Sequence, residues 1–573
     1  MKKLFFLIPA LILFFSCFLT VSAQEESWTC INGHEGNTGK FCNECGAPRP
    51  VPEDPWTCEN GHEGNTGRFC SECGAPRPVP EEPWTCKNGH KGNTGNFCGV
   101  CGVPKNAGAG SSMYDQCSAY ALAKDYTNAF RCFQNAADQG YAEAQVSLGD
   151  CYYFGNGVQK DYAEAVNWYR KAAEQGFEKA QHYLGDCYYY GDGVQQDYAE
   201  AVRWYRMAAE QGFAKAQYNL GTCFYLGRGV QQDSGEAVKW YRLAADQGNA
   251  DAQYMLGNCY YSGEGVQQDF SEAVRWYKLA ADQGNDWAQN DLGECYYYGE
   301  GVQRDYAEAV KWYRLSADQG HVYAQKNLGI CYENGTGVQQ DYAEAVKWYR
   351  LAADQGDADA QNAMGFLYFL GRGVNEDKAE AAKWYRLSAD QGNAKAQYNL
   401  GKCYHYGDGV QKDYAEAVKW YRLSADQGNV RAQYNLGDCY YYGDGVQQDY
   451  AEAVKWYRLS ADQGYAIAQY NMGECYSLGL GVPQDYTEAV RWYRMAADQG
   501  FAGAQNTLGE CYFNGHGVPK DYAEAVKWIR LAADQGNANA QYNMYICYEN
   551  GFGVPADQAE ARRWYDLAIQ NGF

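Results

Sequence analysis

Residues 161–196, DYAEAVNWYRKAAEQGFEKAQHYLGDCYYYGDGVQQ, are the stretch that decides the fold. In its first half, apolar residues recur at the spacing of one helix face, at Tyr162, Ala165, Val166, Tyr169 and Ala173. The second half repeats this spacing at Ala180, Leu184, Cys187 and Tyr188. The stretch therefore predicts two short helices that form a hairpin.

The residues that bound these two helices are typical of helix ends. Asp161 followed by Glu164 resembles a capping box in which Asp is the N-cap. Gly176 fits the position just after the first helix, and the Gly-Asp-Gly of 191–193 interrupts the second. Because the Asp-x-x-Glu pattern recurs in every later unit, we interpret these carboxylates as caps rather than as a catalytic pair.

The unit repeats without insertion to the end of the chain. Tryptophan marks the 36-residue period at Trp168, Trp204, Trp240, Trp276, Trp312, Trp348, Trp384, Trp420, Trp456, Trp492, Trp528 and Trp564. One hairpin cannot bury its apolar stripe alone, so the repetition predicts an all-α solenoid of stacked hairpins. Residues 125–140 match the first half of the unit with Cys132 in place of Trp, and we expect them to form the N-terminal cap. The array then holds thirteen first helices and twelve second helices.

A different repeat precedes the array. Trp28, Trp56 and Trp84 head three near-copies, each with the spacing Cys-x3-His-x7-Cys-x2-Cys. Four N and S ligands suit tetrahedral zinc, and the odd number of cysteines would leave one thiol over in a disulfide knot. We therefore predict three closed structural zinc sites, with intermolecular disulfides or a vestigial site as the alternatives. The ligands are Cys30, His34, Cys42, Cys45, Cys58, His62, Cys70, Cys73, Cys86, His90, Cys98 and Cys101.

Both repeats resemble known families. The unit AEAVKWYRLAADQG followed by AQYNLGxCYYxGxGV resembles the Sel-one-like repeat of the tetratricopeptide superfamily, over roughly residues 113–573. The modules over 28–104 resemble short bacterial zinc ribbons, although their first half is Cys-x3-His where the common ribbon has Cys-x2-Cys. Secreted relatives in the cysteine-rich branch staple each hairpin with two cysteines, whereas the matching positions here are alanines such as Ala173 and Ala180. The resemblance therefore implies reduced thiols in the array.

The first residues read as an export signal. Met1-Lys2-Lys3 is a short positive region, 4–21 is an apolar run, and Val21-Ser22-Ala23 has the small residues of a cleavage site. An uncleaved membrane anchor is the alternative. The expected organisation is a signal peptide over 1–23, the three modules over 24–105, a flexible linker over 106–112 and the solenoid over 113–573.

The array cysteines occupy one position of the second helix. Leu367 replaces the cysteine in one unit, which indicates a buried, small apolar site. Equivalent residues of stacked helices lie roughly 10 Å apart, which exceeds the ~7 Å that a disulfide tolerates. Cys117 and Cys132 fall outside this register, and a bridge between them is compatible with the sequence.

Charge and motifs narrow the function. A net charge of −23 disfavours a nucleic-acid partner, because little would neutralise the phosphates. We find no catalytic motif and no cofactor-binding motif, so we predict no enzyme activity.

Variation among the units indicates a candidate partner surface. The positions of Lys179, Tyr183, Asp186 and Tyr190 vary from unit to unit and share one face of the second helix. At the first of these positions Trp287 and Tyr323 would be exposed, and such residues often anchor interfaces. The alternative is drift on a solvated face.

These observations favour an exported scaffold that binds a protein or peptide. A cell-wall or β-lactam-binding hydrolase of the cysteine-rich secreted branch and a purely structural surface spacer are the alternatives.

Overall fold

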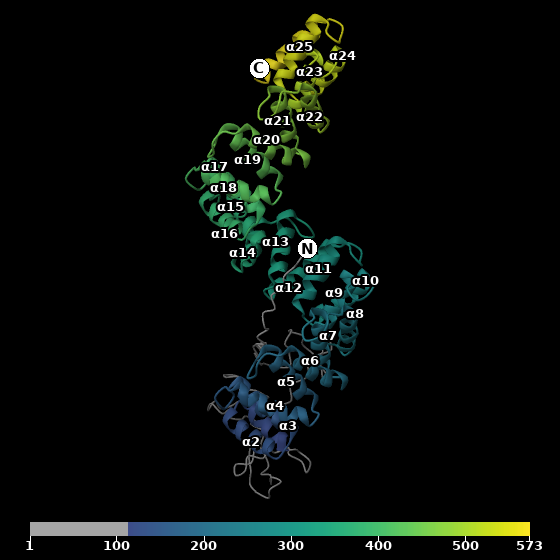
Figure 1. Ribbon diagram of the computed structural model, residues 1–573, viewed down its shortest axis with the longest axis vertical. Helices are drawn as coiled ribbons and strands as arrows, with labels where there is room; N and C mark the ends of the chain where they lie inside the picture. The colour runs from purple at the N-terminus through teal and green to yellow at the C-terminus, as the bar shows by residue number, and fades with distance from the viewer. Residues whose placement is uncertain (1–112) are drawn as a thin grey trace, which may run out of the picture. The chain divides into compact units, whose positions relative to one another are not determined.

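The computed structural model describes residues 113–573, which fold into 26 helices with no strand among them (Figure 1). The predicted signal peptide, zinc modules and linker lie outside the described residues. The described chain belongs to two compact units, 113–172 and 173–573, and each is described by itself.

The first helices of the hairpins begin one residue after the repeated Asp, as the capping pattern predicts. In α6 the Asp197 carboxylate accepts the backbone N–H groups of Ala199 and Glu200. The first helices are α2 (Tyr126–Asp138), α4 (Tyr162–Glu174), α6 (Tyr198–Glu210), α8 (Ser234–Asp246), α10 (Phe270–Asp282), α12 (Tyr306–Asp318), α14 (Tyr342–Asp354), α16 (Lys378–Asp390), α18 (Tyr414–Asp426), α20 (Tyr450–Asp462), α22 (Tyr486–Asp498), α24 (Tyr522–Asp534) and α26 (Gln558–Gln570).

The second helices end at the first glycine of the Gly-x-Gly turn. Gly191 closes α5 with a φ of 84°, a left-handed conformation that glycine adopts without strain. The second helices are α3 (Ala142–Phe154), α5 (Glu178–Tyr190), α7 (Ala214–Leu226), α9 (Ala250–Ser262), α11 (Asp286–Tyr298), α13 (Val322–Asn334), α15 (Ala358–Leu370), α17 (Ala394–Tyr406), α19 (Val430–Tyr442), α21 (Ala466–Leu478), α23 (Ala502–Asn514) and α25 (Ala538–Asn550).

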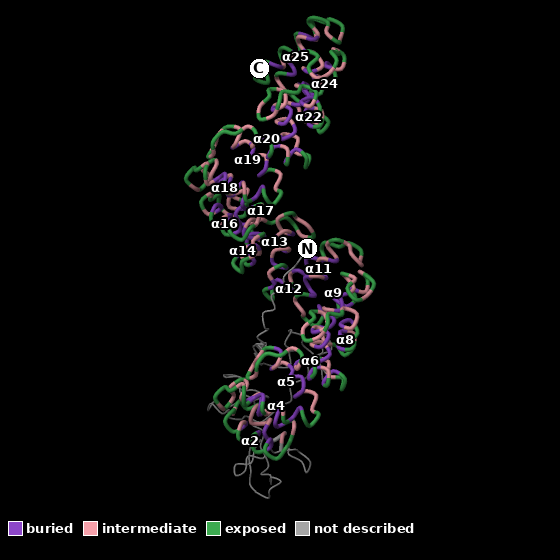
Figure 2. The backbone as a smooth tube through the Cα atoms, viewed as in Figure 1, coloured by how far each residue is buried: buried purple, intermediate pink, exposed green. Residues whose placement is uncertain are grey.

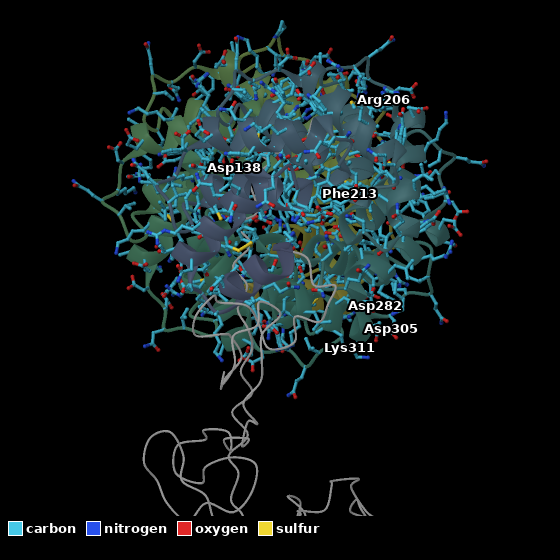
Figure 3. The ribbon with its side chains drawn as sticks, turned by 90° about the horizontal axis from the view of Figure 1, so that it is seen from below. Asp138, Arg206, Phe213, Asp282, Asp305 and Lys311 are labelled. Carbon is cyan, nitrogen blue, oxygen red and sulfur yellow. A yellow bond between two sulfur atoms is a disulfide. The ribbon has the colours of Figure 1, made fainter. Side chains whose placement is uncertain are left out.

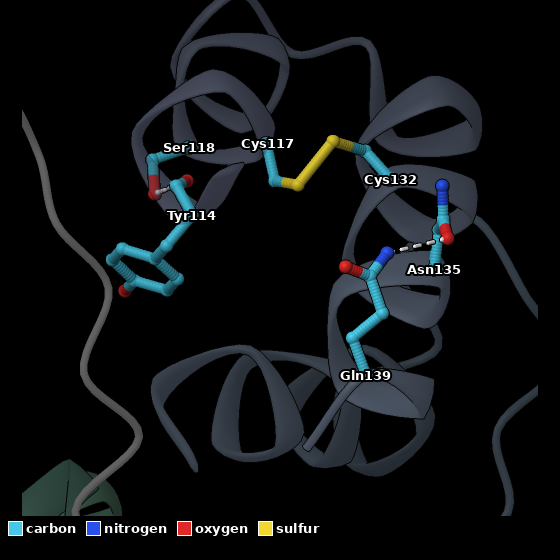
Figure 4. The surroundings of a disulfide bond; sticks show 6 residues. All are labelled: Tyr114, Cys117, Ser118, Cys132, Asn135 and Gln139. Atoms are coloured by element: carbon cyan, nitrogen blue, oxygen red, sulfur yellow. Dashed lines mark hydrogen bonds between the residues drawn. A yellow bond between two sulfur atoms is a disulfide. The ribbon is translucent and has the colours of Figure 1, made fainter. Parts of the chain in front are cut away.

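The unit of 113–172 begins with a helix that the sequence did not predict. Helix α1 (Met113–Leu122) precedes the first matched half-unit, and a disulfide between Cys117 and Cys132 joins it to α2 (Figure 4). The Cα atoms of the two cysteines lie 5.1 Å apart. The bridge that the sequence allowed is therefore present, and the N-terminal cap consists of α1 and α2 rather than of 125–140 alone.

Each hairpin of the 173–573 unit completes its core with a tryptophan from the next hairpin. Buried residues accordingly recur along the helices of this unit, between exposed stretches (Figure 2). Trp312 of α12 is 8% exposed and packs in the core between α10 and α11, beside Tyr277 and Leu292. The invariant Trp is thus a contact between hairpins, and the prediction that one hairpin cannot bury its stripe alone is confirmed.

A glycine in the second helix makes room for the tyrosine of the next first helix. A Cβ atom on Gly293 would lie only 2.7 Å from the Tyr313 ring, and Tyr313 is 2% exposed. The same pairing recurs through the unit, for example between Gly257 and Tyr277. Any larger residue at the glycine would displace a buried ring.

A glutamine that recurs at one position of every second helix, Gln289 in α11, links hairpins by hydrogen bonds. Within its hairpin, Gln289 donates its side-chain N–H to the carbonyl oxygen of Ala281 at 3.1 Å. Gln319 of the next hairpin donates to the Gln289 side-chain oxygen at 2.8 Å. Equivalent glutamine pairs recur along the unit, which explains why this position does not vary.

The eleven register cysteines are free and buried, as predicted. Burial raises the pKa of Cys295 to about 12, so its thiol stays neutral at physiological pH. Leu367 is also fully buried, which confirms that the position is an apolar site.

Candidate partner-binding surface

The variable positions of the second helices lie away from the hairpin cores. In α5, Lys179 and Asp186 are half-buried and Tyr190 is 62% exposed. We call this set of positions, with its equivalents in α7 to α25, the second-helix face. Trp287 of α11 and Tyr323 of α13 occupy it at 41% and 48% exposure, so both rings are accessible, as the sequence predicts.

Three rings from two consecutive hairpins meet on this face. The Trp287 and Tyr323 ring centroids lie 6.2 Å apart. His321 lies against both, with its ring centroid 4.5 Å from that of Trp287 and 5.8 Å from that of Tyr323. We call Trp287, His321 and Tyr323 the aromatic triad. Residues 34 and 36 positions apart in the sequence therefore form one cluster.

His321 holds the triad in place because it is also the N-cap of α13. Its Nδ1 accepts the backbone N–H of Ala324 at 3.3 Å, a role that sequence analysis missed. Burial lowers the pKa of His321, so the ring is neutral and its proton lies on Nε2. His321 is 6% exposed, and its buried Nε2 has no hydrogen-bond partner.

Carboxylates flank the triad on neighbouring second helices. Asp251 of α9 accepts a hydrogen bond from Asn285, the N-cap of α11, at 3.1 Å. Asp359 of α15 accepts the equivalent hydrogen bond from Asn393, the N-cap of α17, at 2.9 Å. Burial raises the pKa of Asp251, since desolvation disfavours its charged form.

Lys326 is the cation nearest to Tyr323. Its Nζ lies 5.2 Å from the Tyr323 ring centroid, and it is 3.7 Å from a carboxylate oxygen of Asp357 and 3.6 Å from one of Asp359. One face of the triad thus already holds an ammonium group between a ring and two carboxylates.

Polar side chains of this surface, together with buried neighbours, join consecutive second helices. Asn327 of α13 donates to the Asn290 side-chain oxygen at 3.1 Å and to a Glu294 carboxylate oxygen at 3.3 Å, both in α11. Tyr254 of α9 donates to Asp291 of α11 at 3.1 Å. These bonds fix α9, α11 and α13 against one another, so the triad stands on a rigid base.

Exposed apolar residues continue the surface toward α15. Phe366 is 39% and Leu370 is 40% exposed, at the positions that Asp186 and Tyr190 occupy in α5. In most other units the first of these two positions is polar or charged. The stretch from α11 to α15 is therefore richer in exposed apolar side chains at these positions than α5 is.

Comparison with known proteins identifies the repeat. The Sel1 repeat model matches thirteen times, at residues 118–141, 142–177, 178–213, 214–249, 250–285, 288–321, 322–357, 358–393, 394–429, 430–465, 466–501, 502–537 and 538–573. The chain belongs to the Sel1 repeat family. Sel1 repeat scaffolds are non-catalytic repeat proteins that generally mediate contacts between proteins.

Solved structures of Sel1 repeat proteins are similar to this chain. A protective antigen of uropathogenic Escherichia coli with the SLR fold is 39% identical, with a TM-score of 0.66, over 77% of this chain and 94% of that one. A Sel1 repeat protein from Oxalobacter formigenes is 34% identical, with a TM-score of 0.44, over 54% of this chain and 89% of that one. No protein with a curated description matches.

Within residues 113–573, the Sel1 array contains no cluster of side chains that could bind a metal ion. No group of three or more His, Cys, Asp or Glu side chains is placed to hold an ion in this part of the chain. The twelve predicted zinc ligands of the N-terminal modules lie outside the described residues. None of the helices from α1 to α26 is long and apolar enough to cross a membrane.

One histidine of the Sel1 array lies beside a carboxylate. His182 Nδ1 is 3.6 Å from an Asp186 oxygen, while Tyr205 and Asn219 donate hydrogen bonds to the other oxygen of that carboxylate. Burial lowers the pKa of His182 to about 3 and raises that of Asp186 to about 7. Because the imidazole is neutral and buried, and because Asn219 of α7 donates to Asp186 of α5, we interpret this cluster as a structural link between second helices.

Proposed function

We propose that this Sel1 repeat protein is an exported scaffold that binds a protein or peptide through the second-helix face. The observation that carries the proposal is the exposure of Trp287 and Tyr323 side by side, on a base held by hydrogen bonds. Aromatic side chains with fixed positions are typical anchors of protein interfaces, because they bury much area and lose little conformational freedom.

The first helices are less suited to recognition, because the exposed Lys or Arg that recurs along them is already paired with a Glu of the same helix. Lys311 of α12 lies 2.6 Å from a Glu308 carboxylate oxygen, and the same pair recurs in the other first helices from α6 to α26. Lys311 lies at the periphery of the end-on view (Figure 3). This uniform surface carries little information for a partner, whereas the second-helix face differs in each unit.

A pull-down with cross-linking, from cells that export the protein, tests the proposal. Wild-type chain should capture a defined partner, and Trp287→Ala should reduce the yield at least about tenfold, as loss of an interface anchor does. Tyr486→Ala is the matched control, because Tyr486 is an exposed aromatic residue of the first helix α22, outside the second-helix face. Equal capture by all three proteins contradicts the proposed site.

We further propose that the three N-terminal modules each hold one structural zinc ion. Three thiolates and one imidazole per module are a donor set that suits zinc. Metal analysis of the purified chain should find three zinc ions, and Cys70→Ser should leave two. The matched control is Cys475→Ser, which changes a buried thiol of the array and should leave three. An unchanged zinc count in Cys70→Ser contradicts the assignment.

A further inference from the structure

We propose that the aromatic triad binds a cationic peptide segment, with a partner Lys or Arg side chain packed on the Trp287 ring beside the carboxylates of Asp251 and Asp286. This inference rests on the proposed function and names the chemistry of its partner. The occupant is an extended segment of another protein, read by one positive side chain and by its backbone.

The tryptophan rings of this fold pair with cations as a rule. Arg242 lies over Trp276 at 5.9 Å from the ring centroid, and Lys278 lies over Trp312 at 5.1 Å. Every register tryptophan except Trp240 has such a neighbour. Trp287 stands outside the register and is more exposed than the buried register rings, yet no Lys or Arg of the described chain lies over it. A ring of this kind is open to a cation from outside.

Charge complementarity favours the same occupant. Asp251 and Asp359 flank the two exposed rings on the adjacent second helices, and Asp286 immediately precedes Trp287. Lys326 is paired with Asp357 and Asp359. Asp251 accepts a hydrogen bond from Asn285, but neither Asp251 nor Asp286 forms an ion pair within residues 113–573, so both can attract a partner's positive charge. The chain as a whole carries −23, which adds a long-range attraction for basic segments.

Lys326 shows within the molecule how such a side chain would be held. Its ammonium group lies over the Tyr323 ring and against two carboxylates at once. Trp287 has groups of the same kinds near it in the fold, since Asp286 precedes it in α11 and Asp251 holds the equivalent position of α9. A partner Lys or Arg would therefore repeat on Trp287 what Lys326 does on Tyr323.

The row of positions also favours an extended peptide over a small cation. Asp251, Trp287, Tyr323 and Asp359 are equivalent residues of four successive second helices, so they present one continuous line. The His321 ring packs edge-on against the Trp287 ring, and its buried Nε2–H lacks an acceptor, which is costly. A turn of the exposed indole would open this N–H to a backbone carbonyl oxygen of the bound segment.

On either side of the stretch from Asp251 to Asp359, the equivalent position is held by a lysine, so the charge along the row changes from negative to positive. Lys215 precedes Asp251, and Lys395 follows Asp359 at the equivalent position of α17. These lysines repel further positive charge, so the cationic side chain has one favoured place along the row. A segment with its positive residue at the centre fits this pattern better than a uniformly basic tail does.

Fluorescence anisotropy with short labelled peptides tests the inference on the full chain. The probe is a nine-residue Gly/Ser peptide with a central Arg, and its matched control has Gln at that position. We expect the Arg peptide to bind at least about tenfold more tightly than the Gln peptide, and its affinity to fall with added salt. Equal binding of the two peptides overturns the inference.

Variants locate the contact. Trp287→Ala should weaken binding of the Arg peptide about tenfold, whereas Trp287→Phe, which keeps a ring, should retain part of it. Asp251→Asn should weaken binding a few-fold, because one carboxylate is lost. Tyr486→Ala and Asp426→Asn, which change an exposed ring and an exposed carboxylate of the first helices, are the matched controls and should bind as wild type. Circular dichroism checks that each variant is folded.

The outcomes separate this inference from the proposed function. If a captured partner depends on Trp287 but neither peptide binds, or if both peptides bind alike, the cationic inference is wrong and the scaffold function stands. Competition by choline as strong as that by the Arg peptide would also overturn it, since the occupant would then be a small cation. If Trp287→Ala changes neither capture nor peptide binding, both proposals fail.

Discussion

The two helices of each hairpin differ in what varies along them. The first helices repeat almost unchanged, with an Asp cap, a buried tyrosine and a surface Lys or Arg paired with Glu. The second helices keep only their buried positions, such as Leu292 and Gly293, while their exposed positions change from unit to unit. The buried positions and the first-helix surface are thus nearly constant, whereas the second-helix face, on which we propose that a partner binds, differs from unit to unit.

The largest expected effect comes from alkaline pH and concerns the buried cysteines of the second helices. Folding raises the pKa of the buried register thiols from an ordinary value near 9 to about 12 in most units. Unfolded thiols ionise above about pH 9 while folded ones do not, so the free energy of unfolding falls as pH rises beyond that value. Each thiol contributes a slope of up to about 1.4 kcal/mol per pH unit.

Denaturant unfolding followed by circular dichroism between pH 8 and 11 measures this slope. Cys295→Ala should reduce it by the share of one thiol. An identical slope in the variant would show that other groups, such as the buried tyrosines of the first helices, carry the pH dependence.

The next largest effect is expected from a buried tryptophan, and an exposed tryptophan serves as its comparison. Trp276→Ala removes a ring that is 3% exposed and fills the preceding hairpin's core, so we expect a loss of about 3–5 kcal/mol in unfolding free energy. Trp287→Ala, on the second-helix face, should cost far less. Denaturant titration of both variants measures the difference. Similar losses would break the distinction between scaffold and recognition positions.

A smaller effect is expected where a second helix meets the next first helix. Gly293→Ala places a methyl group 2.7 Å from the buried Tyr313 ring and should cost about 1–3 kcal/mol. Gly235→Ala in the first helix α8 is the control, because its methyl group would meet only the Asp233 side chain, at 3.3 Å, apart from more distant backbone. The control should be neutral or stabilising, since alanine favours helix. Thermal unfolding of both variants tests this sign difference.

The smallest effect is expected on the first-helix surface. Lys311→Ala removes an exposed ion pair with Glu308, which water screens, so the unfolding free energy should change less than in any of the variants above. Binding of the Arg peptide should be unchanged. A clear loss of peptide affinity would show that the first helices take part in recognition.

Sequence analysis predicted the hairpins well because their signals are local. The Asp cap, the apolar spacing and the terminating glycines lie within one helix, and the paired charges lie three residues apart. The exposure of Trp287 and Tyr323 also followed from their place in the unit. Helix α1 was missed because it matches the repeat poorly.

Other features depended on contacts between hairpins. The sequence marked Trp312 and Gln289 as constant, but did not say that one completes the previous hairpin's core and the other accepts a hydrogen bond from the next hairpin. The capping role of Asn285 and His321 had a signal, since asparagine recurs just before several second helices, and that signal was overlooked.

The sequence by itself determined the helix bounds, the 36-residue period and the family of this protein, because these depend on spacing within a single unit. Only the tertiary structure decided that Trp287, His321 and Tyr323 form one cluster, with Asp251 and Asp359 on the adjacent second helices. The physical reason is that stacking brings residues 34 and 36 positions apart into contact. The relative placement of their side chains depends on how hairpins pack, which no local pattern specifies.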